Sequence, residues 1–260
     1  MAIRSGRWSL RWFGTCAALA AGCTLMLAQA CAASRDRTLD LQDPEELFKA
    51  QAKASCSTVQ GRPALYWWSG RMWARTPGEP DRHLFNVQGM NIRQCAIKMD
   101  RTQGFCYRSV SREVMLYLDP RTNEILRNWR NPWTGEQLTV VHVANDPVNM
   151  RPGQWACSRD REGKPIVRES LFVKDELVLE GGAAARLFYK NPLGGEYQDY
   201  VGGVYQALEF GTTAVPLTVA QNPRVTEFND AVISWGRISR WLPWMKMGDR
   251  EGLVIFHTAG

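Results

Sequence analysis

Hydrophobic and polar side chains alternate along much of this chain, which is the pattern of half-buried β-strands. In the segment ALYWWSGRMWAR, Leu65 and Trp67 fall on one side while Tyr66 and Trp68 fall on the other. Similar patterns, separated by glycine and proline turn signals, return at 83–97, 103–110, 166–173, 176–181, 185–191, 200–210, 231–248 and 252–260. Many strands at short spacing predict an all-β, mainly antiparallel fold, arranged as a barrel or a strongly curved sheet.

The segment 111–149 carries the clearest strand and turn signals. Three strand-like runs, REVMLYL, ILRNWRN and QLTVVHV, are followed by Asp-Pro, Asn-Pro and Asn-Asp-Pro turns. Proline fixes φ and cannot continue a hydrogen-bonded ladder, so these turns set where each strand ends. We therefore predict an antiparallel meander at 111–149.

One short helix is expected near the start of the folded region, over 44–55. Asp43 can cap it, Pro44 suits its first turn, and Glu46 completes the spacing of a capping box. Leu47 then lies on an apolar face.

The first 30 residues have the pattern of a secretory signal peptide. Three arginines open the segment without any acidic residue, an apolar run follows, and Ala28 and Ala30 stand at the positions that signal peptidase reads. The apolar run is short for a membrane span. We expect a signal peptide at 1–30, a linker at 31–41 and a single β-rich domain over 42–260, without a transmembrane segment.

Export implies a periplasmic or secreted protein. A lipid anchor at Cys23 or Cys31 is the less favoured alternative, because Ala stands three residues earlier where a lipoprotein signal usually has Leu. Loss of the three signal arginines lowers the formal net charge from +6 to +3, and no nucleic-acid partner is expected. The chain stops directly after an apolar strand pattern, which suggests a slightly longer protein; the oligomeric state stays open.

Beyond Cys31 at the expected cleavage site, four cysteines follow in the β-rich domain, an even number that suits an oxidising compartment. They are Cys56, Cys95, Cys106 and Cys157. Cys95 and Cys106 are symmetric about a hairpin tip at 100–101, so we predict a disulfide between them; four free thiols are the alternative. No CxxC or HxxxH spacing is present, so we expect no metal site, and no motif indicates a cofactor.

Three residues are candidates for acid–base chemistry: His142, Asp146 and Glu209. The ordinary pKa of histidine lies near neutrality, so His142 could act as an acid or a base, and Glu209 beside aromatic residues could serve as a general acid. The competing interpretations are a structural histidine, a plain Asp146 turn, and an ion pair of Arg237 with Glu113 or Glu209. A Ser111–His142–Asp146 triad is disfavoured, since no nucleophile elbow surrounds the serine.

Aromatic and polar residues at several strand positions suggest a ligand cavity, because tryptophan combines apolar area with one N–H donor. The candidate binding residues are Trp67, Arg112, Tyr117, Trp129, Asn145, Asn149, Tyr205, Trp235, Arg237, Trp241 and Trp244. We expect Arg112, His142, Glu209 and Arg237 to contribute to one cavity or to its rim. Trp241 and Trp244 would cover one opening of the barrel, or alternatively fill the core.

Five blocks of sequence carry a family resemblance: WWSGRMWA, FNVQGMNIR, SREVMLYLDP…EILRNWRNPWTGE, VVHVANDPVN and SWGRISRWLPWMKMGDREG. Together they resemble a bacterial and fungal family known as domain of unknown function 1838, over roughly residues 40–259. The resemblance implies one domain, with Asn145, Asp146, Asn149, Arg237 and Trp244 inside its motifs. Relatives usually have Glu-Gly where this chain has Gln88-Gly89, which weakens a role for a carboxylate there.

The sequence supports three hypotheses for function. The first is an exported domain that binds a lipophilic or aromatic small molecule in a cavity lined by tryptophan and tyrosine. The second is a cofactor-free isomerase, hydratase or hydrolase that uses acid–base residues in that cavity. The third is an envelope protein that binds a partner through its tryptophan-rich C-terminal stretch.

Overall fold

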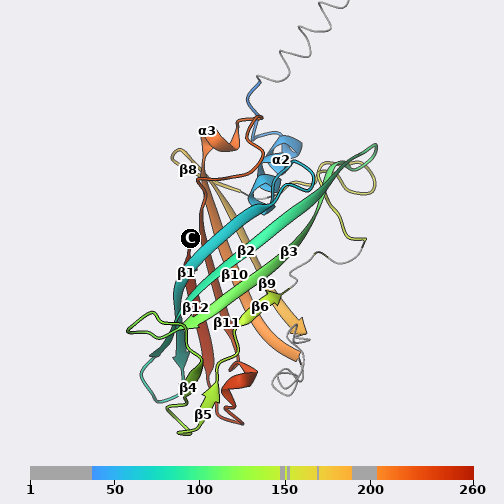
Figure 1. Cartoon of the computed structure of the whole chain (residues 1–260). Helices are drawn as coiled ribbons and strands as arrows, with labels where there is room; N and C mark the ends of the chain where they lie inside the picture. The colour runs from blue at the N-terminus through green and yellow to red at the C-terminus, as the bar shows by residue number, and fades with distance from the viewer. Residues whose placement is uncertain (1–36, 147–149, 151–152, 169, 189–203) are drawn as a thin grey trace, which may run out of the picture. The chain divides into compact units, whose positions relative to one another are not determined.

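In the part of the chain that the structure describes, ten antiparallel strands form one large sheet, and two more form a separate hairpin (Figure 1). The computed structural model describes residues 37–146, 150, 153–168, 170–188 and 204–260, and Leu39–Gly260 forms one compact unit. The predicted signal peptide at 1–30 lies outside the described residues. The strands are β1 (Ala64–Arg75), β2 (Arg82–Asp100), β3 (Gly104–Leu118), β4 (Asn128–Arg130), β5 (Gln137–Thr139), β6 (Val143–Asp146), β7 (Ala156–Cys157), β8 (Leu171–Val173), β9 (Glu176–Phe188), β10 (Val204–Pro216), β11 (Val232–Ser239) and β12 (Leu253–Ala259).

The order of strands in the large sheet is β6-β3-β2-β1-β12-β11-β10-β9-β8, and β7 also pairs with β3. The first and last long strands, β1 and β12, therefore lie side by side in the middle of the sheet. Figure 1 shows β1–β3 crossing in front of β9–β12, so the sheet is strongly curved. The prediction of an antiparallel, all-β fold with a strongly curved sheet is confirmed; among the described residues the ladder stays open, with β6 and β8 at its edges.

The region predicted as a meander runs antiparallel, but its hydrogen bonding is interrupted. The turn after β3 forms at Asp119, whose Oδ1 accepts the backbone N–H groups of Arg121 and Thr122. Only an isolated bridge between Leu118 and Ile125 then continues the pairing. The next two strands, β4 and β5, form their own hairpin, and β6 returns to pair with β3.

The predicted helix is present as α2 (Pro44–Ser55). Asp43 caps it, since its Oδ1 accepts the backbone N–H groups of Glu45 and Glu46 at 2.9 and 3.0 Å. Glu46 does not close a capping box on Asp43; its carboxylate instead accepts the backbone N–H of Asp40. Two short helical segments follow later, α3 (Leu217–Ala220) and η2 (Pro243–Met245).

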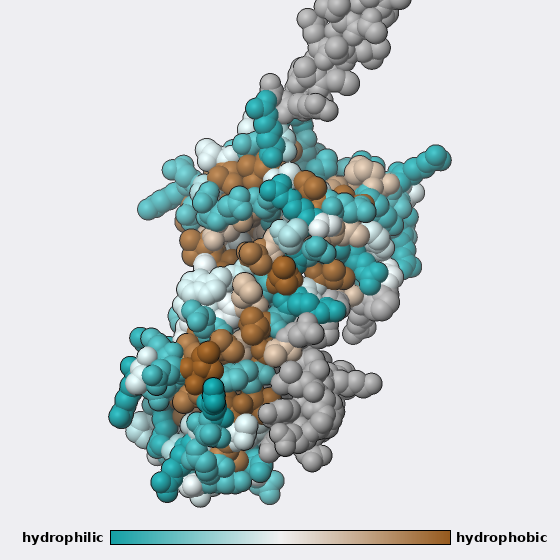
Figure 2. All heavy atoms as spheres, in the orientation of Figure 1, coloured by the Kyte–Doolittle hydropathy of each residue, from teal (hydrophilic) through white to brown (hydrophobic). Residues whose placement is uncertain are grey.

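Hydrophobic side chains gather in separate clusters rather than in one continuous core. The largest cluster lies on β1, β2, β3, β12 and η2, with Met72, Phe85, Trp244 and Phe256 among its buried members. The other two involve α2. One includes Leu47 and residues of β9, β10 and α3, and the other packs Phe48 against Phe105 of β3 with ring centroids 6.2 Å apart. On the face in Figure 2, hydrophobic and polar residues are interspersed.

The predicted disulfide between Cys95 and Cys106 is wrong. The structure pairs Cys56 with Cys95 and Cys106 with Cys157. In the β2–β3 register Cys95 lies opposite Ser109, and Cys106 lies opposite Lys98. Side chains alternate between the faces of a sheet, so Cys95 and Cys106 are on opposite faces and cannot meet. The Cys56–Cys95 bridge joins the C-terminal end of α2 to β2.

No helix in the described part of the chain is long and apolar enough to cross a membrane.

Candidate functional site

An open groove of about 840 Å³ lies between α2 and the sheet. Its lining comes from α2, from β1–β3 and from β9–β11. The residues that line it are Gln51, Ala54, Ser55, Tyr66, Arg93, Tyr107, Arg168, Leu179, Glu180, Gly181, Glu209, Phe210, Gly211, Thr212, Thr213, Ile233, Ser234 and Trp235. Because these elements are far apart in sequence, only the curvature of the sheet brings them to one place.

Tyr66 and Arg93 form one wall of the groove. The guanidinium carbon of Arg93 lies 4.4 Å from the centre of the Tyr66 ring, and Arg93 Nε donates to Asn91 Oδ1 at 2.9 Å. Asn91 is 1% exposed, and its Nδ2 donates to Glu113 Oε2 at 3.2 Å. The arginine is thus held by a stacked ring on one side and by a buried amide on the other.

Hydroxyl groups line the groove where α2 ends. The Tyr66 hydroxyl donates to the carbonyl oxygen of Ala54 at 2.9 Å, and the hydroxyls of Ser55 and Tyr107 lie 3.1 Å apart. Burial raises the pKa of Tyr66, while the nearby charge of Arg93 acts in the opposite direction. Tyr66 is therefore a neutral hydrogen-bonding group at physiological pH.

The opposite wall carries the ion pair that the sequence left open. Arg237 Nε donates to Glu209 Oε1 at 2.7 Å, and a second nitrogen of the same guanidinium bonds to the same oxygen. Arg237 is buried and also lies over the ring of Trp235, 5.1 Å from its centroid. Trp235 packs in turn against Phe256 of the largest core cluster. These three predicted residues do come together, and the Glu209 carboxylate is already engaged by Arg237.

Two glycines lie beside Trp235 on the inner face. In the strand register Gly211 pairs with Gly181 on one side and with Trp235 on the other. Neither glycine carries a side chain. The wall is therefore recessed at these two positions, whereas the side chains of neighbouring positions project into the interior. A β-carbon added at Gly181 would meet no atom within 4 Å.

His142 occupies a different place, at the edge of the largest core cluster. Its Nδ1 accepts the backbone N–H of Tyr117 at 3.1 Å, and its Nε2 lies 2.9 Å from the carbonyl oxygen of Leu126. The ring stacks on Tyr117 with centroids 5.9 Å apart. Burial lowers the pKa of His142, with the Leu126 hydrogen bond acting in the opposite direction. Both ring nitrogens are used by the backbone, which is the geometry of a structural histidine.

Tyr117, Trp129 and Trp244 are brought together, but inside the core. Tyr117 and Trp244 are 2% and 5% exposed, and all three rings lie within 6 Å of Phe85, centroid to centroid. Trp244 therefore fills the core rather than covering an opening. Trp241 is only partly buried: it packs on Trp133 at 5.1 Å and donates from Nε1 to the carbonyl oxygen of Arg250.

The remaining predicted residues do not reach the groove or cannot be placed in it. Arg112 is exposed and bonds to the carbonyl of Ser111. Because His142 also lies elsewhere, only Glu209 and Arg237 of the four residues expected in one cavity come together. Trp67 is 51% exposed and pairs in register with Met90 on the outer face. For three further positions the structure describes the backbone but not the side chain. They are Asn145 and Asp146 in β6 and Tyr205 in β10. Asn149 lies outside the described residues.

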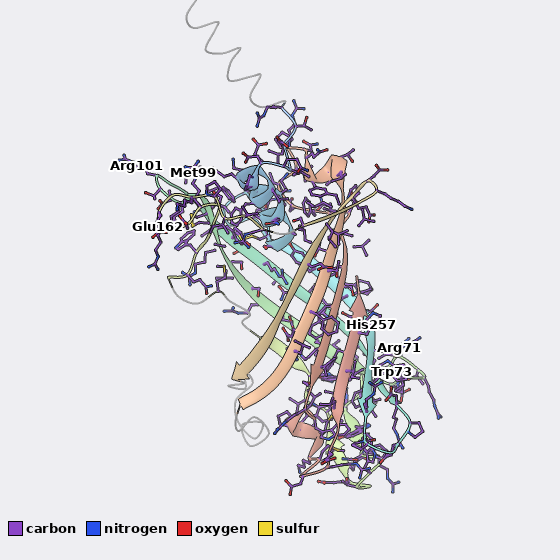
Figure 3. All side chains as sticks on the ribbon, turned by 180° about the vertical axis from the view of Figure 1, so that it is seen from behind. Arg71, Trp73, Met99, Arg101, Glu162 and His257 are labelled. Carbon is purple, nitrogen blue, oxygen red and sulfur yellow. A yellow bond between two sulfur atoms is a disulfide. The ribbon has the colours of Figure 1, made fainter. Side chains whose placement is uncertain are left out.

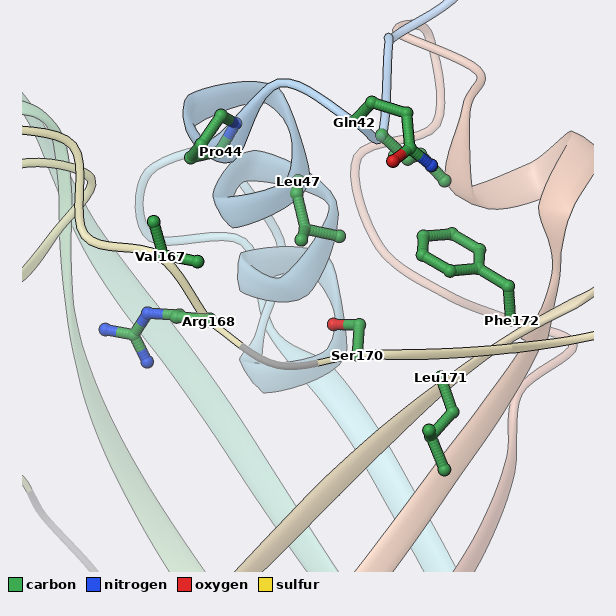
Figure 4. Close-up of a pocket in the computed structure, with 9 residues that line it drawn as sticks. Gln42, Pro44, Leu47, Val167, Arg168, Ser170, Leu171 and Phe172 are labelled. Atoms are coloured by element: carbon green, nitrogen blue, oxygen red, sulfur yellow. The ribbon is translucent and has the colours of Figure 1, made fainter.

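A second, smaller cavity of about 400 Å³ lies on the other side of α2. It is formed by the start of the helix and by the segment that leads into β8 (Figure 4). Leu47, Val167, Leu171 and Phe172 give it an apolar lining, and Arg168 lies at its boundary with the larger groove. Its walls offer few hydrogen-bonding groups, so the larger groove is the better candidate for specific binding.

Sequence reasoning missed Arg93, Tyr107, Ser55 and the paired glycines. Arg93 stands in an alternating strand, and its phase relative to Asn91 places both on the same face. The sequence therefore predicts that Asn91 and Arg93 share a face, but it does not show which face of the strand is directed to the interior. In the described parts of the chain, no group of three or more His, Cys, Asp or Glu side chains is placed to hold a metal ion.

The comparisons with known proteins address the family of the chain. No curated protein and no solved structure gives a significant match. The family model described as "Protein of unknown function (DUF1838)" matches residues 61–260, which includes every strand of the large sheet and most of the groove. The resemblance carried by the five sequence blocks is thereby confirmed, and the chain belongs to this family.

Proposed function

We propose that this domain binds a small, mainly apolar or aromatic molecule in the groove between α2 and the inner face of the sheet. The observation that carries the proposal is the recess at Gly181 and Gly211 beside Trp235, between the core clusters. A volume of about 840 Å³ falls within the roughly 300–1,000 Å³ of small-molecule sites.

The lining suits such a ligand. Tyr66, Tyr107 and Trp235 supply aromatic surface, and Leu179 and Ile233 add apolar surface. Hydroxyls and arginines at the α2 end would orient the molecule, in the way that a few polar groups do in apolar pockets.

Export is part of the proposal. The signal-like N-terminus supports it, and the two disulfides are compatible with an oxidising compartment. The protein would then meet its ligand in the periplasm or outside the cell.

The test is a fluorescence titration with N-phenyl-1-naphthylamine, a neutral aromatic probe whose emission rises in apolar surroundings. We expect saturable binding to the wild-type domain and at least about tenfold weaker binding to Gly181→Phe, whose ring would occupy the recess. The β-carbon finds open space at Gly181, so the strand should tolerate the substitution.

Gln88→Phe is the matched control. Gln88 is exposed on β2, so this substitution adds the same ring on the outer face of the sheet. Its affinity for the probe should stay within about twofold of wild type. Binding that is absent in the wild type, or unchanged in Gly181→Phe, would rule out this groove as the site.

A further inference from the structure

Two arginines enter the groove without a carboxylate partner among the described residues. Arg93 uses Nε on Asn91, and its guanidinium is stacked on Tyr66. Arg168 stacks on Phe48, with its guanidinium carbon 4.8 Å from the ring centroid. Neither arginine forms an ion pair with any carboxylate whose position the structure describes. The terminal nitrogens of Arg93 are therefore available for a planar, two-oxygen acceptor.

The acidic residues of the lining do not neutralise these arginines. Glu209 is bonded to Arg237. Glu180 lies opposite Thr212 in the β9–β10 register. Thr212 is an odd number of residues from Glu209 along β10, so the side chain of Glu180 points to the face of the sheet opposite that of Glu209. Glu113, outside the lining, accepts a hydrogen bond from Asn91. The charge of Glu227 also reaches Tyr66, but that carboxylate is bonded to Ser57 and Thr226 and paired with Arg62.

The position of Arg93 is fixed before any ligand arrives. The buried Asn91 amide is oriented by Glu113, because its Nδ2 donates to that carboxylate and leaves Oδ1 to accept from Arg93. A preorganised guanidinium loses little side-chain freedom on binding, and it forms stronger hydrogen bonds with a charged acceptor than with a neutral one.

We infer that the ligand of this groove is an amphipathic anion, whose carboxylate or similar oxyanion is bound by Arg93 with Arg168 while its apolar body lies along Trp235 and the recess at Gly181. This inference rests on the proposed function and specifies its ligand class. The hydroxyls of Ser55 and Tyr107, 3.1 Å apart, supply further hydrogen-bonding groups at the anionic end.

The experiment compares two probes that share one aromatic body. 1-Anilinonaphthalene-8-sulfonate carries an anionic group that N-phenyl-1-naphthylamine lacks. We expect the wild-type protein to bind the sulfonate at least about tenfold more tightly at low salt, with the advantage shrinking as ionic strength rises. Gly181→Phe should weaken both probes, which ties the sulfonate signal to the groove.

Arg93→Gln should remove most of the advantage of the sulfonate and leave the neutral probe within about twofold of wild type. Arg93→Lys keeps the charge but not the planar fork, so it should give an intermediate affinity. Arg71→Gln is the matched control, since Arg71 is exposed on the outer face of β1 beside His257 of β12 (Figure 3). Arg168→Gln, on an exposed segment, replaces Arg93→Gln if the latter does not fold.

The outcomes separate the two proposals. Equal affinity for both probes, or parallel loss of both in Arg93→Gln, would overturn the anionic ligand and leave the groove intact as a binding site. A wild-type protein that binds neither probe would overturn both.

Discussion

Gly89 of β2 lies directly beneath the indole ring of Trp68, its register partner on β1. A β-carbon at position 89 would lie 2.4 Å from Cε2 and Cζ2 of that ring. Trp68 is buried, so its ring has little room to move. The glycine of the FNVQGMNIR block is thus explained by close packing within the sheet.

Gly89→Ala should lower the free energy of unfolding by about 1–3 kcal/mol, because the added methyl overpacks a buried position. Urea denaturation would measure it. In the Trp68→Leu background the same substitution should cost much less, since the smaller side chain frees the space. Gly181→Ala is the matched control and should be neutral or slightly stabilising, given the open space at that position. Equal costs in both backgrounds would contradict the contact.

Trp244→Ala should destabilise the protein by about 3–5 kcal/mol, because the indole fills the core between Phe85, Tyr117 and Trp129. Trp67→Ala provides the comparison: this indole is half exposed on the outer face, and its loss should cost less than about 1 kcal/mol. Thermal and urea unfolding of both variants would measure the difference. A Trp244→Ala protein with wild-type stability would return this residue to the role of a cover over an opening.

The disulfide pairing predicts an unusual result for one double variant. Cys95→Ser with Cys106→Ser should remove both bridges at once, because each cysteine belongs to a different pair. Each lost bridge should cost about 2–4 kcal/mol of stability. Peptide mapping without reduction should recover Cys56 linked to Cys95 and Cys106 linked to Cys157 in the wild type. Recovery of a Cys95–Cys106 linked peptide from the wild type would instead support the pairing expected from the sequence.

Stability should fall as the pH drops below about 6.5, the ordinary pKa of histidine. Burial lowers the pKa of His142 in the folded protein, so the unfolded chain binds more protons in this range and acid favours unfolding. Protonation of Nδ1 would also break the hydrogen bond from the Tyr117 backbone.

Nitrogen NMR of the His142 ring would test this directly, with the proton expected on Nε2 at neutral pH and a titration midpoint below 6.5. The free energy of unfolding of His142→Asn, measured from pH 7.5 to 5.5, should depend less on pH than that of the wild type. A ring that titrates above 6.5 in the folded protein would contradict the structural role.

The local features of this protein could be predicted from the sequence because they depend on neighbouring residues. Asp43 and Pro44 start α2 through contacts within one helical turn, and alternation marks the long strands because side chains project to opposite faces. The sequence blocks identified the family in the same direct way.

The tertiary structure decided everything that depends on which strands meet and in which register. Cys95 faces away from Cys106 because the β2–β3 register pairs it with Ser109. Gly181 and Gly211 form a recess only because β9 and β10 place them opposite each other beside Trp235. Trp67 and Trp244 look alike in the sequence, yet one is half exposed and the other is buried. A one-residue change of register exchanges the two faces of a strand, and the curvature of the whole sheet determines which face becomes the interior.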